Sequence, residues 1–150
     1  AHPLKHLGLP ITPWRSEDEI VYPQAAECLA LLHEKYRIGI IANQKLGTAS
    51  RMEQYGLSQY LDLIIASAEE GMEKPDLQIF ELALKRANCL PENAAMIGDR
   101  LDNDIAPAKR LGLKTIWIRQ GFCGMGHPIT EMSTPDHCVN DLGELVELLR

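Results

Sequence analysis

Short, nearly continuous apolar runs alternate with amphipathic segments along most of this chain. Such runs indicate parallel strands covered on both faces, and they lie at residues 37–42, 61–66, 95–97 and 114–118, with a shorter one at 138–139. Apolar residues at helical spacing predict helices over 23–35, 48–55, 77–87, 103–111 and 141–149. This alternation predicts an α/β domain with a mostly parallel sheet and right-handed crossovers.

Residues that favour helix ends mark the limits of several helices. Pro23 suits a first helical turn, Thr48 is expected to be an N-cap, and Asp141 is expected to cap the last helix. The stretches 67–72 and 120–135 carry no strand or helix pattern, so we expect both to be loops.

The first 22 residues differ in character from the rest of the chain. They contain three prolines and a polar run at 15–19, and they show no strand pattern. We therefore expect an irregular N-terminal segment over 1–22 and one folded domain over 23–150, a length that can bury a proper core.

Composition and charge narrow the class of function. The 150 residues are 45% hydrophobic and carry a net charge of -6, so binding to nucleic acid or to an anionic membrane is not expected. No apolar run approaches the roughly 20 residues of a membrane span. The four cysteines form no Cys-x-x-Cys pair, and they indicate reduced thiols in a cytoplasmic protein.

Polar residues stand at three places where a parallel sheet would gather them. The pair 42–43 ends one strand, Lys74 precedes a helix, and an acidic cluster over 99–104 comes after the strand at 95–97. The carboxyl ends of parallel strands share one edge, where ligands bind. A lysine and turn N–H groups suit phosphoryl oxygens, and carboxylates suit Mg2+, so the pattern predicts a phosphate-and-magnesium site.

Three motifs occur in order, namely Ile38-Gly-Ile-Ile-Ala-Asn43, Glu73-Lys-Pro-Asp76 and Ile97-Gly-Asp-Arg-Leu-Asp-Asn-Asp104. As a set they resemble the second, third and fourth motifs of the haloacid dehalogenase superfamily, in the branch whose cap domain sits between the first two motifs. The resemblance covers residues 20–150. It implies a Rossmann-like three-layer α/β/α core and Mg2+-dependent hydrolysis of a small phosphorylated metabolite through an aspartyl-phosphate.

The resemblance also implies roles for individual residues. Lys74 matches the catalytic lysine that steadies the nucleophile and the transferred phosphoryl group. Ala42 and Asn43 would bind phosphate with Lys74, through main-chain N–H groups and the Asn43 amide. Asp99 matches the acid that binds magnesium, and Asp104 matches a second acid that binds it through water. Asp104 is equally suited to the start of a helix, where an acid favours the N-terminal dipole.

Two departures from the family pattern change what this chain is expected to do. The first motif of the family is an Asp-x-Asp that supplies the nucleophile and the general acid, whereas the one Asp-x-Asp here is at 102–104. Ala42 also stands where the family has Ser or Thr. We therefore expect an incomplete portion of a phosphohydrolase that lacks its first central strand and its cap and is inactive alone. Residues 1–22 would be a cap remnant or would fold back into the gap.

Other interpretations remain open. Strands beside a missing central strand have bare edges, which favour association, so a homodimer through the unpaired sheet edge is one expectation. The alternative function is a noncatalytic domain of the same fold that binds a ligand or a protein, and Ala42 favours it. A response-regulator receiver is a weaker alternative, because the acids of a receiver come at the ends of its early strands.

Overall fold

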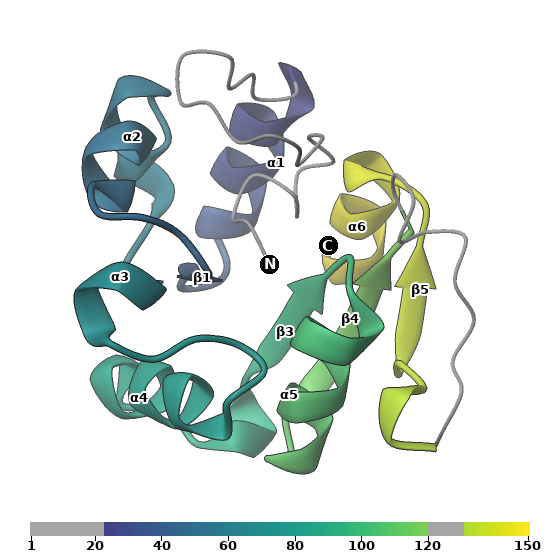
Figure 1. Cartoon of the computed structure of the whole chain (residues 1–150). Helices are drawn as coiled ribbons and strands as arrows, with labels where there is room; N and C mark the ends of the chain where they lie inside the picture. Colours follow the sequence, from purple (N-terminus) through teal and green to yellow (C-terminus); the bar gives the residue numbers. More distant parts are fainter. Residues whose placement is uncertain (1–22, 120–130) are drawn as a thin grey trace.

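The computed structural model describes residues 23–119 and 131–150 (Figure 1). Its elements are α1 (Pro23–His33), β1 (Gly39–Ala42), α2 (Thr48–Gln54), β2 (Leu63–Ala66), α3 (Ser67–Glu70), α4 (Leu77–Ala87), β3 (Ala95–Gly98), α5 (Ala106–Arg110), β4 (Lys114–Ile118), β5 (His137–Val139) and α6 (Leu142–Leu149). The expected irregular segment 1–22 and most of the expected loop 120–135 lie outside the described residues. Within the described ranges, no helix has the length and apolar character needed to cross a membrane.

The five strands of the described ranges form two parallel sheets. β1 pairs with β2, and Ala42 lies opposite Ala66 at the end of that ladder. In the second sheet β4 is central, with β3 on one side and β5 on the other. Gly98 of β3 lies opposite Trp117 of β4. The parallel arrangement agrees with the nearly continuous apolar runs of the sequence.

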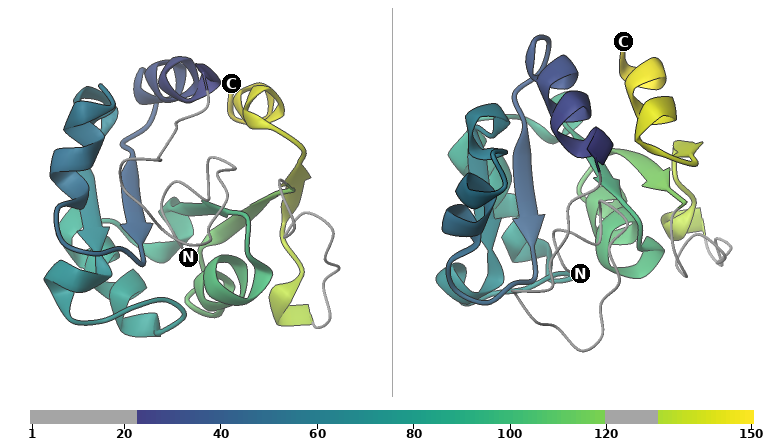
Figure 2. Two further views of the ribbon diagram at one scale, coloured as in Figure 1. Left: turned by 45° about the horizontal axis from the view of Figure 1, so that its top comes forward. Right: turned by 90° about the horizontal axis from the view of Figure 1, so that it is seen from above.

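Helices cover both faces of the sheets and complete the three layers (Figure 2). α1 and α6 lie side by side on one face, where the core consists of Ala25, Cys28, Leu32, Ile116, Ile118, Val139, Leu142 and Leu145. On the other face, Phe80 of α4 packs with Ile65 of β2 and Met96 of β3. α4 therefore contacts both sheets. In a third cluster, Leu29 of α1 and Ile40 of β1 pack against the same buried residues.

The two sheets stand next to each other without pairing. Among the described residues, β1 pairs only with β2, and β3 pairs only with β4. A cavity of about 210 Å³ lies between β1 and β3, beneath α1 and α6, and both of these strands line it. Ile40, Ile41 and Ile97 are only half-buried, although helices cover both faces. Within the described ranges, β1 and β3 are therefore neighbouring edges of two separate sheets.

Helix starts agree with the predictions in one case and differ in another. Asp141 caps α6 as predicted, because its carboxylate accepts the Glu144 N–H at 2.8 Å. Thr48 was predicted to cap α2 but is its first residue, and Gly47 takes the N-cap position with a φ of 90°. That left-handed backbone costs little for glycine, which has no Cβ.

Two segments differ from the predicted secondary structure. The stretch 67–72 was predicted to be a loop, yet Ser67–Glu70 forms one helical turn, α3. One turn is too short to show a hydrophobic period. The helix predicted over 103–111 is divided, since a π-helical turn at Leu101–Ile105 precedes α5.

Candidate active site

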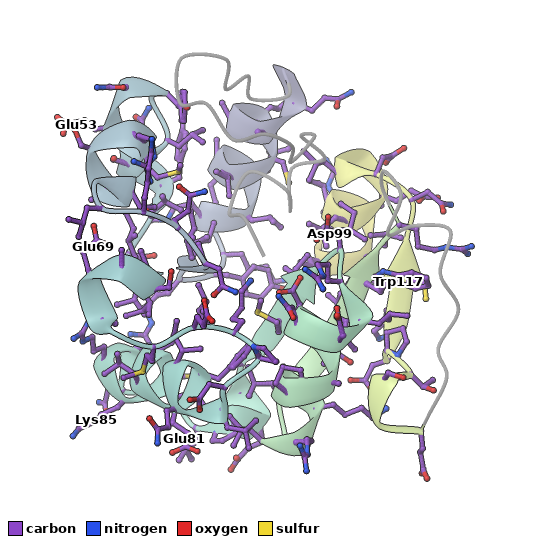
Figure 3. The ribbon with its side chains drawn as sticks, viewed as in Figure 1. Glu53, Glu69, Glu81, Lys85, Asp99 and Trp117 are labelled. Atoms are coloured by element: carbon purple, nitrogen blue, oxygen red, sulfur yellow. The ribbon has the colours of Figure 1, made fainter. Side chains whose placement is uncertain are left out.

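Three segments of the chain converge at the carboxyl ends of β1 and β3 (Figure 3). They are the residues after β1, the loop before α4, and the residues after β3. Asn43 bonds to Lys74, which in turn bonds to Asp104, across 31 and 30 residues of sequence. Lys74, Asp99 and Asp104 are each at most 2% exposed. The structure therefore brings together predicted site residues from all three segments.

Lys74 and Asp104 form a buried ion pair. Lys74 Nζ donates to Asp104 Oδ1 at 2.7 Å, and neither side chain has exposed surface. Burial lowers the pKa of Lys74 below its ordinary value, while Asp104, and after it Asp99, oppose that shift. A buried pair contributes little net stability, because desolvation of both ions offsets their attraction. Its position at a sheet edge thus points to chemistry.

Asp104 is packed against the end of β3. Its Oδ2 accepts the main-chain N–H of Arg100 at 3.2 Å. A Cβ at Gly98 would lie 2.6 Å from Asp104 Cγ, so glycine leaves the room that the carboxylate occupies. Asp104 lies in the π-helical turn, and its two oxygens bond to Lys74 and to Arg100.

Asp99 comes directly after β3 and is buried with it (Figure 3). Its charge opposes the lowering of the Lys74 pKa, after the larger effect of Asp104. Its main-chain oxygen accepts the indole N–H of Trp117 at 3.1 Å. A carboxylate in such a buried place needs positive charge or hydrogen-bond donors nearby, which favours a cation-binding role for it.

Asn43 uses its side chain to hold Lys74. Its Nδ2 donates to the Lys74 carbonyl at 2.9 Å, and its Oδ1 accepts the Lys74 N–H at 2.8 Å. These two hydrogen bonds fix the main chain from which the lysine extends. The amide of Asn43 is therefore bonded to the protein, and its contribution to phosphate would come from the main-chain N–H. Ala42 is fully buried and carries no hydroxyl.

Two residues that the sequence pattern did not single out, Arg51 and Ser67, form hydrogen bonds to the turn after β1. The Arg51 guanidinium donates to the carbonyls of Lys45 and Leu46 and to Gln44 Oε1. Ser67 Oγ accepts the Gln44 N–H at 2.8 Å. The sequence feature that could have indicated this role is the position of Arg51, one turn into the helix that follows Gly47. These bonds give the turn a fixed shape.

Asp102 has a structural partner of its own. Its carboxylate accepts two bonds from the Arg100 guanidinium, at 3.0 and 2.6 Å, and one from the Asn103 N–H. Desolvation works to raise the pKa of Asp102, but these bonds outweigh it and the pKa is lowered. Asp102 is exposed, and its partners shape the turn that leads to Asp104.

The donor set of the site suits a hard cation. Asp99 and Asp104 offer carboxylate oxygens, and Mg2+ is commonly held by one or two carboxylates with waters and substrate phosphate. Neither at this site nor elsewhere in the described ranges do three or more His, Cys, Asp or Glu side chains form a group that could hold a metal ion. The residues fit a magnesium site in which the protein supplies few ligands.

Comparison with known proteins decides the family. The sequence profile of the haloacid dehalogenase-like hydrolases matches residues 14–112, which is more than half of the chain. This chain belongs to the haloacid dehalogenase-like hydrolases. The family membership inferred from three motifs is confirmed, and so is the α/β fold class.

Relatives within the haloacid dehalogenase-like hydrolases cover most of the chain. It is 34% identical over 123 residues to glyceraldehyde 3-phosphate phosphatase of Pyrococcus furiosus, covering 81% of this chain and 50% of that protein. It is 33% identical over 141 residues to ribulose-1,5-bisphosphate 5-phosphatase of Halopiger xanaduensis, covering 89% and 58%. The HAD-hydrolase YfnB of Bacillus subtilis, solved bound to magnesium, superposes with a TM-score of 0.78 at 24% identity, covering 90% and 58%. The chain spans about half the length of these curated relatives.

Proposed function

We propose that this chain is part of a Mg2+-dependent phosphohydrolase that cleaves a small phosphorylated metabolite through an aspartyl-phosphate. Lys74 contacts the transferred phosphoryl group, and Ala42 and Asn43 present main-chain N–H groups to it. Asp99 binds the metal directly, and Asp104 binds it through a water molecule. The observation that carries the proposal is the buried convergence of Lys74, Asp99 and Asp104 at the carboxyl end of parallel strands in a chain of this family.

The proposed chemistry assigns a task to each of these residues. A carboxylate attacks phosphorus, the ester P–O bond breaks, the alcohol leaves with a proton, and water then hydrolyses the acyl phosphate. The Lys74 ammonium offsets charge on the transferred oxygens. Asp104, 2.7 Å from Nζ, directs that ammonium and favours its protonated form. When bound at Asp99, Mg2+ would neutralise further negative charge on the phosphoryl group.

We also propose that the nucleophile belongs to an extended segment that fills the space between β1 and β3, and that the chain alone is inactive. In support, the one Asp-x-Asp of the sequence is at 102–104. The facing edges of β1 and β3 are not paired with each other in the described ranges. The 210 Å³ cavity on the α1 side and a groove of about 360 Å³ on the α4 side share lining residues from both strands.

Two further proposals concern association and location. In the part of the chain that the structure describes, the facing edges of β1 and β3 carry no further strand, and such edges template pairing. We therefore propose a homodimer through the unpaired edge when no segment fills the space. Cys28, Cys89 and Cys138 are free thiols. Free thiols at these positions support a reducing, cytoplasmic location.

The test compares the chain alone with a form to which the segment is supplied. Five β-branched apolar residues and then an Asp-x-Asp are joined to the N-terminus through a Gly/Ser linker. Phosphate release from glyceraldehyde 3-phosphate and ribulose 1,5-bisphosphate, the substrates in the relatives' names, is measured with Mg2+. We expect turnover only in the supplied form, and its loss in Lys74→Met and Asp99→Asn. Sedimentation is expected to give a dimer for the chain alone and a monomer for the supplied form.

Each contrary result has a distinct meaning. Turnover by the chain alone that disappears in Asp99→Asn would contradict the proposed incompleteness and leave the phosphohydrolase in place. A supplied form without turnover, together with Mg2+ binding unaffected by Asp99→Asn, would favour the noncatalytic binding domain. The observation that favours the noncatalytic domain is that Ala42 carries no hydroxyl.

A further inference from the structure

The peptide unit that joins Asp99 to Arg100 is held by side chains at both of its polar ends. Trp117 Nε1 donates to the Asp99 carbonyl oxygen at 3.1 Å. Asp104 Oδ2 accepts the Arg100 N–H at 3.2 Å. Trp117 comes from β4 and Asp104 from the turn after β3, so two separate elements fix one peptide plane.

We propose that Trp117 is a positioning residue for the cation site at Asp99. Its indole N–H fixes the main chain at Asp99 and, with it, the direction in which the carboxylate leaves the sheet. This inference rests on the proposed function, because it takes Asp99 to be a ligand of a divalent cation.

The place of Asp99 in the sheet explains why such a hold is needed. The β3–β4 register ends with Gly98 opposite Trp117, so Asp99 lies one residue beyond the last strand pair. The bond from Trp117 Nε1 holds the main chain just past that point, where buried polar groups still need partners. Trp117 and Asp99 are each 2% exposed, so this hydrogen bond lies in a buried place, where losing a partner is costly.

The contacts of Trp117 also separate its hydrogen bond from its other interactions. The Arg119 guanidinium lies over the Trp117 ring, 5.2 Å from the ring centroid. That contact involves the ring face rather than the N–H bond to Asp99. Arg119→Lys keeps the positive charge, alters the contact with the ring face and leaves the indole N–H in place, so it serves as a matched control.

The test removes the N–H group, in one variant with a bicyclic ring of nearly the same shape kept in its place. Benzothienylalanine at position 117 has sulfur in place of the indole N–H, and Trp117→Phe is the simpler counterpart. Mn2+ alone is the probe, and its binding to the folded chain is measured by electron paramagnetic resonance. We expect about tenfold weaker affinity in both Trp117 variants, as for other residues that orient a metal ligand. Affinity should be unchanged in Arg119→Lys and lost in Asp99→Asn.

A second readout reports on the bond itself. In 15N-labelled chain, the indole N–H signal that disappears in Trp117→Phe should broaden when Mn2+ is added, because Trp117 lies one hydrogen bond from Asp99. Equal Mn2+ affinity in the native and benzothienylalanine chains would overturn the inference and leave Asp99 as a cation ligand. Failure of the native chain to bind Mn2+, or binding that survives Asp99→Asn, would overturn the cation site and the inference together. If Trp117→Phe unfolds, the benzothienylalanine chain decides.

Discussion

The Lys74 ammonium and the Asp104 carboxylate lie 2.7 Å apart with no exposed side-chain surface on either. Asn43, the residue after β1, holds the main chain of Lys74, and Asp104 lies in the turn after β3. The ion pair is thus the middle of a polar connection between the two sheets, whose facing strands are not paired with each other in the described ranges. Its loss should affect both folding and the site.

Replacing Lys74 by Met keeps much of the side-chain volume and removes the cation beside Asp104. We expect the free energy of unfolding to fall by about 3 to 5 kcal/mol, because the carboxylate stays buried while its charge partner is gone. Urea unfolding at pH 7 measures the change. Lys85→Met, at an exposed position of α4, is the control and should change stability by less than about 0.5 kcal/mol.

The double variant Lys74→Met with Asp104→Leu tests whether the two charges are coupled. Removing both should recover much of the loss, since no buried charge of the pair remains. The coupling energy from the four unfolding curves is expected to be about 2 to 3 kcal/mol. Additive losses in the double variant would show that the pair does not act as a unit.

Gly98 is expected to tolerate no side chain. A Cβ there would lie 2.6 Å from Asp104 Cγ, so Gly98→Ala must push the carboxylate away from Lys74. We expect a loss of about 1 to 3 kcal/mol in unfolding free energy, as for overpacked cores. In Gly39→Ala the nearest atom is Leu63 Cβ at 3.3 Å, and this change should cost less. Equal losses in the two variants would mean that contact with Asp104 is not the cause.

Asn43→Asp should weaken the hold on Lys74 without changing side-chain size. The new carboxylate still accepts the Lys74 N–H, but its second oxygen faces the Lys74 carbonyl, where Nδ2 now donates at 2.9 Å. We expect a loss of about 1 to 3 kcal/mol at pH 7, measured by urea unfolding. Asn93→Asp adds the same charge at an exposed position and should have little effect. A smaller loss at pH 3, where the acid is protonated and can donate, would support this cause.

The sequence predicted the elements of this fold well where burial sets the pattern. The strands around Ile40 and Ile116 are apolar runs because parallel strands are covered on both faces. α4 was predictable because Ile79, Phe80 and Ala83 recur at helical spacing. The position of Asp99 directly after a strand was predictable for the same reason, since parallel strands deliver the residues at their carboxyl ends to one edge of the sheet.

The partners within the site were not predictable in this way. Lys74 and Asp104 are 30 residues apart in the sequence, and the spacing of apolar residues within a helix or strand does not indicate a contact over that separation. The Asn43 side chain bonds to main-chain atoms, which are the same for every residue type, so the sequence carries no sign of the partner. Trp117 is a buried residue of an apolar strand, and its N–H bond to Asp99 depends on the strand register.

Cys28 should be the least reactive of the described thiols. Burial, with the charge of Glu27, raises the pKa of Cys28 to about 11, and the side chain is 4% exposed beneath α6. Because the folded pKa is raised, the thiolate fraction at pH 8 is far below that of an ordinary thiol, and the thiolate is the species that reacts. With iodoacetamide at pH 8, peptide mass spectrometry should find exposed Cys138 alkylated first and Cys28 last.

The pH and urea dependence of Cys28 alkylation separates burial from other causes of low reactivity. The Cys28 rate should keep rising between pH 9 and 11, as the thiol with the raised pKa loses its proton. It should equal the Cys138 rate once urea has unfolded the chain, because both thiols are then in water. Equal rates at pH 8 without urea would show that α1 opens from the sheet on the labelling timescale, and that its packing on α6 is weaker than the buried cluster indicates.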